Sequence, residues 1–325
     1  MFARVQPPLL FLLTLLLGAG LAPPAVGQQA ELDAPPPPLG APNPELTLNS
    51  PLPLLRQPAS ARRDSNWVPV EVDENVPQVE PGSACNLDDF LSKAGARIQE
   101  FVANVERFTA TQSLLHESFN KGGGVLGKEQ RKYDYMVSVE EIRPHMLNVE
   151  EFQSSRSAMD FPGGIAAKGL PALLLIFHPY YADYFSMQCE GLASLNGKPA
   201  WQIYFRQRKD RPNYVRSYRI GWNGPAFPIA LKGRAWFSPE NYQIESLQAD
   251  LIDPVPEIRL NVDHTRIEYG PVHFNSRDVD FWLPKTAEVY CDVRGKRMHQ
   301  RMTFSDYLLF AVDDKQRISA PKIDP

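Results

Sequence analysis

The stretch Phe281–Phe310, FWLPKTAEVYCDVRGKRMHQRMTFSDYLLF, decides the fold of this chain. Two runs of alternating apolar residues flank Arg294-Gly295-Lys296, which indicates a β-hairpin with glycine in a tight turn. From Ala287 to Val293 every second residue is apolar or cysteine. A period of two places one face on a core and the other in water, as in an antiparallel sheet.

The same alternation recurs upstream, so strands make up most of the chain. Asn196-Gly197 joins two such runs and is a strong hairpin signal. Apolar residues at three- and four-residue spacing predict an amphipathic helix from Leu87 to Val105. The apolar run Pro171–Phe177 opens with proline and predicts a short buried helix.

These elements predict a mainly β (α+β) fold. A long antiparallel meander must curl to protect its edges, and a helix with one apolar face can fill the hollow. We therefore expect a curved antiparallel sheet that forms a half-barrel around the N-terminal helix and the short second helix.

The N-terminus has the pattern of a secretory signal peptide. Arg4 precedes an apolar core at Leu9–Leu17, and small residues end the segment at Gly27. We expect residues 1–27 to be removed on export, the alternative being an uncleaved anchor. No cysteine lies near the cleavage point, so a lipid-modified N-terminus is not expected. The expected location is periplasmic or secreted.

Three further segments follow. Residues 28–82 are rich in proline, of which the chain has 31, and predict a disordered linker. The strand-rich domain is expected over 83–318, and 319–325 is a tail. About 230 residues lie within the range of a single all-β domain.

The charge balance bears on the class of partner, and the cysteine count bears on possible disulfides. With 34 basic and 38 acidic residues the formal net charge is -4, which does not favour a nucleic-acid partner. Three cysteines allow one disulfide in an exported chain. Cys189 and Cys291 either pair across the sheet or remain two small buried residues, since sequence cannot place them within bonding distance.

Enzyme signatures are absent from the sequence. It has no G-x-S-x-G, H-E-x-x-H, phosphate-binding P-loop or C-x-x-C motif, so we expect no catalytic residue, metal or cofactor. The segment Gly122–Gly127 matches G-x-G-x-x-G, but a strand pattern follows it in place of a helix. A hairpin loop therefore explains it better than a dinucleotide site.

Three segments resemble the periplasmic lipoprotein-carrier superfamily, the LolA-like and RseB-like half-barrels. Ala96–Ala110 is similar to the passage from helix to first strand, Arg234–Asp250 to a strand–turn–strand unit, and Leu283–Val312 to the closing hairpin. The resemblance covers about residues 85–315 and implies a curved sheet wrapped over helices. No counterpart of the carriers' functional arginine is found.

Candidate ligand-binding residues come from the aromatic content of the second half. If the sheet is a half-barrel, some of these side chains line a concave apolar cleft, the usual place for a ligand. The cleft candidates are Trp201, Ile203, Phe205, Trp222, Trp236, Phe281 and Trp282. A basic run is either a solvated loop or a patch facing anionic lipid head groups. The head-group candidates in it are Arg206, Arg208 and Arg216.

The sequence thus favours an exported, non-enzymatic binding protein that holds a lipid, an acyl chain or a lipoprotein in the concave face. The alternative is an RseB-like envelope sensor or interaction module that docks on an envelope protein. Peripheral membrane contact fits both readings.

Overall fold

A computed structural model describes residues 67, 69–83, 85–105, 107–143, 146–154, 165–168, 170–220, 225–275 and 278–310, which all belong to one compact unit, Pro58–Pro325. The predicted signal peptide and tail, and the linker up to residue 66, lie outside the described residues.

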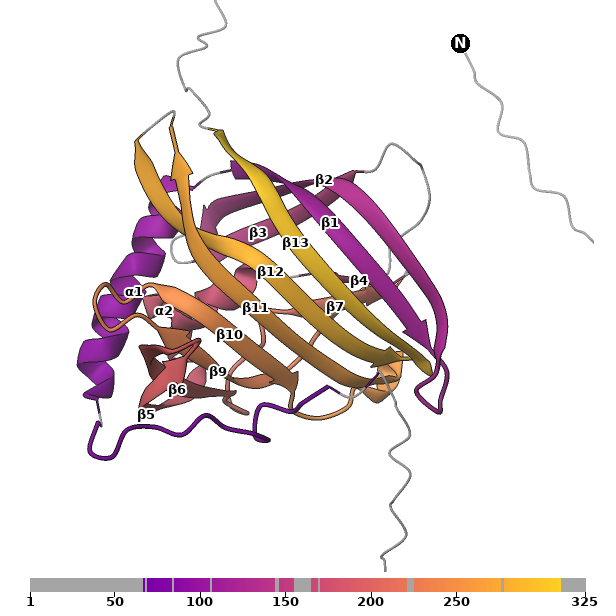
Figure 1. The fold of residues 1–325 in the computed structure, drawn as a ribbon, viewed down its shortest axis with the longest axis horizontal. Coiled ribbons are helices and arrows are strands. Elements are labelled where there is room, and N and C mark those ends of the chain that lie inside the picture. Colours follow the sequence, from indigo (N-terminus) through magenta and orange to yellow (C-terminus); the bar gives the residue numbers. More distant parts are fainter. Residues whose placement is uncertain are drawn as a thin grey trace, which may run out of the picture. The chain divides into compact units, whose positions relative to one another are not determined.

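The described chain is dominated by a ten-stranded antiparallel sheet in the order β3-β2-β1-β13-β12-β11-β10-β9-β6-β5. Figure 1 shows its strongly curved strands. Its ends, β3 and β5, do not pair with each other, so the barrel stays open. The predicted half-barrel class is confirmed. The strands of this sheet are β1 (Arg107–Phe119), β2 (Val125–Arg143), β3 (Met146–Ser154), β5 (Phe185–Leu195), β6 (Lys198–Gln207), β9 (Leu231–Phe237), β10 (Ile244–Leu251), β11 (Leu260–Phe274), β12 (Val279–Val293) and β13 (Lys296–Phe310).

The remaining elements are a small second sheet and the helices. A second sheet has the order β4-β7-β8. Its strands are β4 (Ile165–Lys168), β7 (Ser217–Ile220) and β8 (Ala226–Pro228). The helices are α1 (Leu87–Asn104), the 3₁₀-helix η2 (Pro171–Phe177), α2 (Pro179–Ala182) and the 3₁₀-helix η3 (Pro256–Ile258).

The two predicted hairpin turns are confirmed. Arg294 and Gly295 have φ of 55° and 74°, and Asn196 and Gly197 have φ of 51° and 80°. Two successive residues in the left-handed region match the twist of the flanking strands, which is why asparagine and glycine suit these turns. These turns set the β12–β13 and β5–β6 registers.

The helices provide the core that the sheet wraps. Asn86 caps α1 by accepting from the N–H groups of Asp88 and Asp89. One stripe of α1, including Phe90 and Ile98, is buried, as its spacing predicts. Every residue of η2 is buried, which agrees with the apolar run that opens at Pro171.

The N-terminal boundary of the domain differs from the expectation. The linker was expected to run to residue 82, but residues 67 and 69–83 pack on the outer, convex face of the sheet; we call them the strap. The Trp67 indole donates to the Met298 carbonyl, and Val72 is 3 % exposed. The sequence did not predict these contacts, because Trp67 and Val72 are isolated apolar residues in a proline-rich stretch and follow no periodic pattern.

Candidate ligand-binding site

One half of the hollow, beneath β5 to β10, is filled by the chain's own rings. Phe177 of η2 lies 5.8 Å from Phe205 on β6 and 4.8 Å from Phe237 on β9, measured between ring centroids. Phe90 of α1 lies 5.1 Å from the Phe237 ring. Gly233 makes room for Phe205, because a Cβ at this position would lie 2.4 Å from its Cζ.

The other half contains three adjoining cavities in a row along η2, which we call the seam. The middle cavity is lined only by apolar residues of α1, β1, β2, β3, η2 and β12, among them Val137, Leu174 and Leu283. Its volume is about 10 Å³, so its walls are nearly in contact. The seam is therefore an apolar interface with very little open space at its centre.

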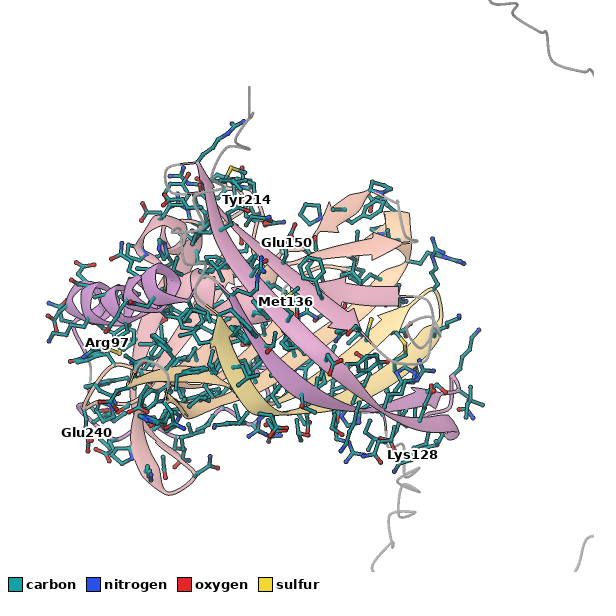
Figure 2. The ribbon with its side chains drawn as sticks, turned by 90° about the horizontal axis from the view of Figure 1, so that it is seen from above. Arg97, Lys128, Met136, Glu150, Tyr214 and Glu240 are labelled. Carbon is teal, nitrogen blue, oxygen red and sulfur yellow. A yellow bond between two sulfur atoms is a disulfide. The ribbon has the colours of Figure 1, made fainter. Side chains whose placement is uncertain are left out.

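One mouth of the seam opens beside β3. This cavity has a volume of about 320 Å³ and shares Val149 and Leu175 with the middle cavity. Its far wall includes Tyr181 of α2 and Tyr214, which is 59 % exposed. Figure 2 marks Tyr214 and Glu150, which both line this mouth.

The second mouth opens between α1, β10 and β12. This cavity has a volume of about 160 Å³ and shares Phe101 and Leu174 with the middle cavity. Phe281 and Trp282 line it, so two of the predicted ligand residues lie at one end of the seam.

The other predicted ligand residues lie away from the seam's lining. Ile203 and Phe205 are completely buried in the main core. Trp201 is half-buried against that core. Trp236 lies on the outer face, where its indole donates to Gln202 and the strap covers it, so its expected place in the concave cleft is corrected. Trp222 lies outside the described residues.

The three predicted head-group arginines do not form a patch. Arg206 is half-buried on β6, at the register position opposite Lys232. Arg208 is more open, and its guanidinium lies 2.8 Å from the Asp210 carboxylate. The Arg216 side chain is 1 % exposed, so it cannot reach a head group; this expectation is corrected.

Arg216 instead forms a buried ion pair that ties the segment before β7 to β11. Its Nη2 donates to Asp263 over 2.9 Å, and the Tyr218 hydroxyl donates to the same carboxylate oxygen. Burial alone would lower the pKa of Arg216, but the Asp263 charge raises it. Burial and the Asp263 charge also raise the pKa of Tyr218, so the hydroxyl stays protonated and donates. The sequence around Arg216 is a run of polar residues and gives no indication that Asp263 is its partner.

The disulfide also differs from the expectation. Cys189 on β5 bonds to Cys85, just before α1, with a Cα–Cα distance of 6.0 Å. Four strands separate β5 from β12, which carries Cys291, and strands about 4.8 Å apart place the two positions well beyond bonding reach. Burial raises the pKa of the Cys291 thiol to about 12, so it is an inert core residue.

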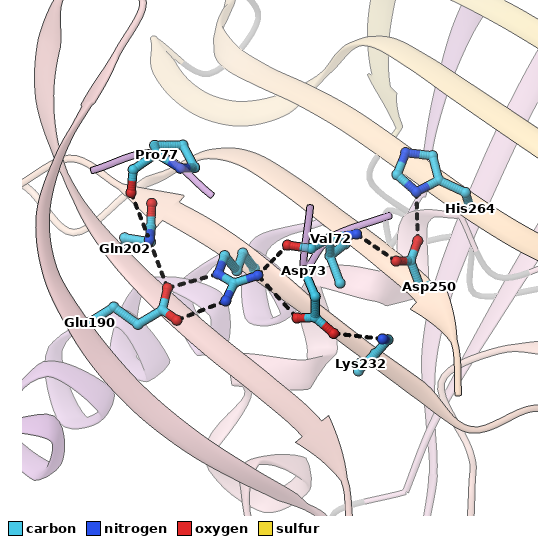
Figure 3. Close-up of polar contacts among 9 residues, drawn as sticks. Val72, Asp73, Pro77, Glu190, Gln202, Lys232, Asp250 and His264 are labelled. Atoms are coloured by element: carbon cyan, nitrogen blue, oxygen red, sulfur yellow. Dashed lines mark hydrogen bonds and ion pairs between the residues drawn. The ribbon is translucent and has the colours of Figure 1, made fainter. Parts of the chain in front are cut away.

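The strap is held on the outer face by a network that the sequence did not predict. Asp250 accepts from the Val72 N–H over 2.6 Å and pairs with Nδ1 of His264 over 2.5 Å (Figure 3). Arg234 makes two hydrogen bonds to Glu190, of 2.8 and 2.9 Å, and also binds the strap at Val72 and Asp73. Arg234, Asp250 and His264 stand on the adjacent strands β9, β10 and β11, and Glu190 stands on β5. Arg234 and His264 line the cavity of about 350 Å³ beneath the strap.

Among the described residues, no group of three or more His, Cys, Asp or Glu side chains is placed to hold a metal ion. Over the same part of the chain, no helix is long and apolar enough to cross a membrane.

No family model and no curated protein sequence matches the chain. Its structure is similar to a domain named for outer-membrane lipoprotein sorting from Vibrio parahaemolyticus, with 12% identity, TM-score 0.38 and coverage of 69% of this chain and 93% of that one. It is also similar to a LolA superfamily protein from Nitrosomonas europaea, with 9% identity, TM-score 0.33 and coverage of 71% and 97%. A DUF1329 family protein from Desulfovibrio piger has 9% identity, TM-score 0.34 and coverage of 68% and 92%. The first two of these structures carry names from the lipoprotein-carrier superfamily that the sequence resembles.

Proposed function

We propose that this chain is an exported, non-enzymatic binding protein that holds an apolar chain, of a lipid or of a lipid-modified protein, along the seam. The supporting observation is the row of three cavities along η2, apolar in the middle and linked through Val149, Leu175, Phe101 and Leu174. A linear apolar ligand fits a linear apolar interface that has a mouth at each end.

Entry of a ligand requires the walls of the middle cavity to separate. Its volume of about 10 Å³ is at the lower limit of the roughly 10–15 Å³ that one water molecule needs, so an acyl chain does not fit without movement. The wall best suited to move is η2, because 3₁₀-helices have poorer hydrogen-bond geometry than α-helices. Burial of the acyl chain, about 0.8 kcal/mol per CH₂, would offset the loss of packing between Leu174, Leu175 and the sheet.

The narrow middle cavity also favours a second candidate. A chain whose interior is nearly closed suits an interaction or sensor module that docks on an envelope protein and carries no lipid. Binding of an acyl probe separates the two.

The test uses a fluorescent 16-carbon acyl probe and its 14-carbon analogue. If the tail lies in the seam, removing two CH₂ groups weakens binding about fifteenfold. Val149→Phe adds volume where the middle cavity meets the β3 mouth and is expected to weaken binding at least tenfold. The control Val125→Phe, at a position 46 % exposed and outside the seam, should leave binding unchanged. No saturable binding by the wild type, or equal weakening by both variants, contradicts the proposal.

A further inference from the structure

The two edge strands of the large sheet, β5 and β3, differ in what pairs with them. At the β5 end, the strap covers the edge: Val79 bridges to Ala193, and the Glu80 N–H donates to the Leu192 carbonyl over 2.7 Å. At the β3 end, no described strand pairs beyond β3. An open strand edge is a template for another extended chain.

The direction of the β3 backbone groups follows from one hydrogen bond. The Leu147 N–H donates to the Tyr181 hydroxyl over 2.9 Å, away from β2. In an antiparallel strand, alternate residues direct both N–H and C=O to the same side, and the β2–β3 register is regular from Leu147 to Ser154. The N–H and C=O of Val149 and Gln153 therefore also face away from β2.

The space on that side is the β3 mouth. Every residue from 147 to 152 lines this cavity, so it runs along the edge of the strand and not over one face. Ala172, Leu175, Tyr181, Tyr214 and Ser217 form the opposite wall. We call this space the edge groove. Six residues of β3 correspond to about 20 Å of extended chain.

The charge of the edge groove indicates its occupant. Glu150 is exposed, and no Lys or Arg is among the described lining residues. A second copy pairing antiparallel through β3 would bring these acidic strands against each other, which is destabilising. Lysine or arginine on the incoming strand would pair with them instead.

We propose that the edge groove binds an extended peptide segment of another protein that carries basic side chains, adding it as a strand beside β3. Backbone hydrogen bonds to Val149 and Gln153 supply affinity, and Glu150 selects basic residues. The Leu147 N–H already donates to the Tyr181 hydroxyl, so the added strand pairs with β3 from Val149 onward. This surface serves a protein partner whether or not the seam holds an acyl chain.

The test uses the full chain and labelled eight-residue peptides read by fluorescence anisotropy. We expect a peptide of alternating lysine and threonine to bind saturably, and its glutamate counterpart to bind at least tenfold more weakly. A lysine–threonine peptide methylated on alternate backbone nitrogens keeps its charge but cannot pair on one edge, so it should lose binding.

Glu150→Lys should weaken the lysine peptide at least tenfold, whereas Glu240→Lys, an exposed position distant from Glu150 in Figure 2, should not. The inference is overturned if no peptide binds at millimolar concentration, if backbone methylation has no effect, or if Glu150→Lys and Glu240→Lys act alike. Acyl-probe binding by the same preparations reports separately on the proposed function.

Discussion

At the scale of single residues, Arg216 and Asp263 form a buried ion pair in the core. Both side chains are 1 % exposed or less, and they connect the segment before β7 to the large sheet. Nη1 of Arg216 has no hydrogen-bond partner among the described residues, so the Asp263 carboxylate, which accepts from Nε and Nη2, provides most of the compensation for the Arg216 charge. Removing that carboxylate leaves a buried charge without its counter-ion.

Asp263→Asn is expected to lower the free energy of unfolding by about 3–5 kcal/mol, the range for breaking one partner of a buried pair. Urea denaturation measures this change. The exposed pair Arg208–Asp210 is the matched control, and Asp210→Asn should leave the midpoint unchanged. Equal stability of Asp263→Asn and wild type would contradict the assigned role.

At the residue level, the sequence correctly predicted which strand residues are buried, but it did not predict the ion-pair partner of Arg216. Alternation correctly placed Ala287, Val289 and Cys291 on the inner face. It cannot say which face of a strand becomes concave, so Trp236 was assigned to the wrong side. The partner of Arg216 is 47 positions away in sequence, and only the fold brings the two side chains together.

At the scale of elements, the strap depends on ionised carboxylates. Burial alone would raise the pKa of Asp73, but hydrogen bonds and charge from Lys232 and Arg234 lower it below the ordinary 3.8. A carboxyl whose pKa is lowered by folding stabilises the folded state above its unfolded pKa, and this contribution is lost as pH falls through the folded value. The strap should therefore loosen in acid.

We expect the hydrogen-exchange protection of the Val72 amide to fall as pH drops below about 4. Asp73→Asn should reproduce the loss at neutral pH, whereas Asp210→Asn, at an exposed position whose carboxylate pairs with Arg208, should not. Constant protection across the acid range would show that Asp73 does not hold the strap.

Element prediction from sequence was good where periodicity or turn chemistry was present. It located α1, the buried run of η2 and both glycine hairpins. Among the residues that line the seam, it named Phe281 and Trp282 as candidates and did not name Val149, Leu174 and Leu175. The alignment of η2 with β3 depends on long-range packing, which leaves no local signal.

At the scale of the whole molecule, the disulfide joins the start of α1 to the strand at one end of the sheet. It links residues 104 positions apart, and a loop of that length gives about 4–5 kcal/mol in the chain-entropy account. It therefore restrains the unfolded chain across the region from α1 to β5.

Cys85→Ala with Cys189→Ala is expected to lower the free energy of unfolding by about 3–5 kcal/mol in guanidinium chloride. Reduction of the wild type should give a similar loss, and the double variant should no longer respond to reductant. A double variant as stable as the oxidised wild type would contradict this role.

The central claim is that the open half-barrel holds an apolar chain against η2. The most direct measurement is mass spectrometry of lipids extracted from the purified, folded protein, compared with Val149→Phe and Val125→Phe purified in the same way. We predict close to one acyl-bearing molecule per wild-type and Val125→Phe chain, and strong depletion in Val149→Phe. An extract without bound lipid from wild-type protein that also fails to bind the acyl probe would contradict the claim.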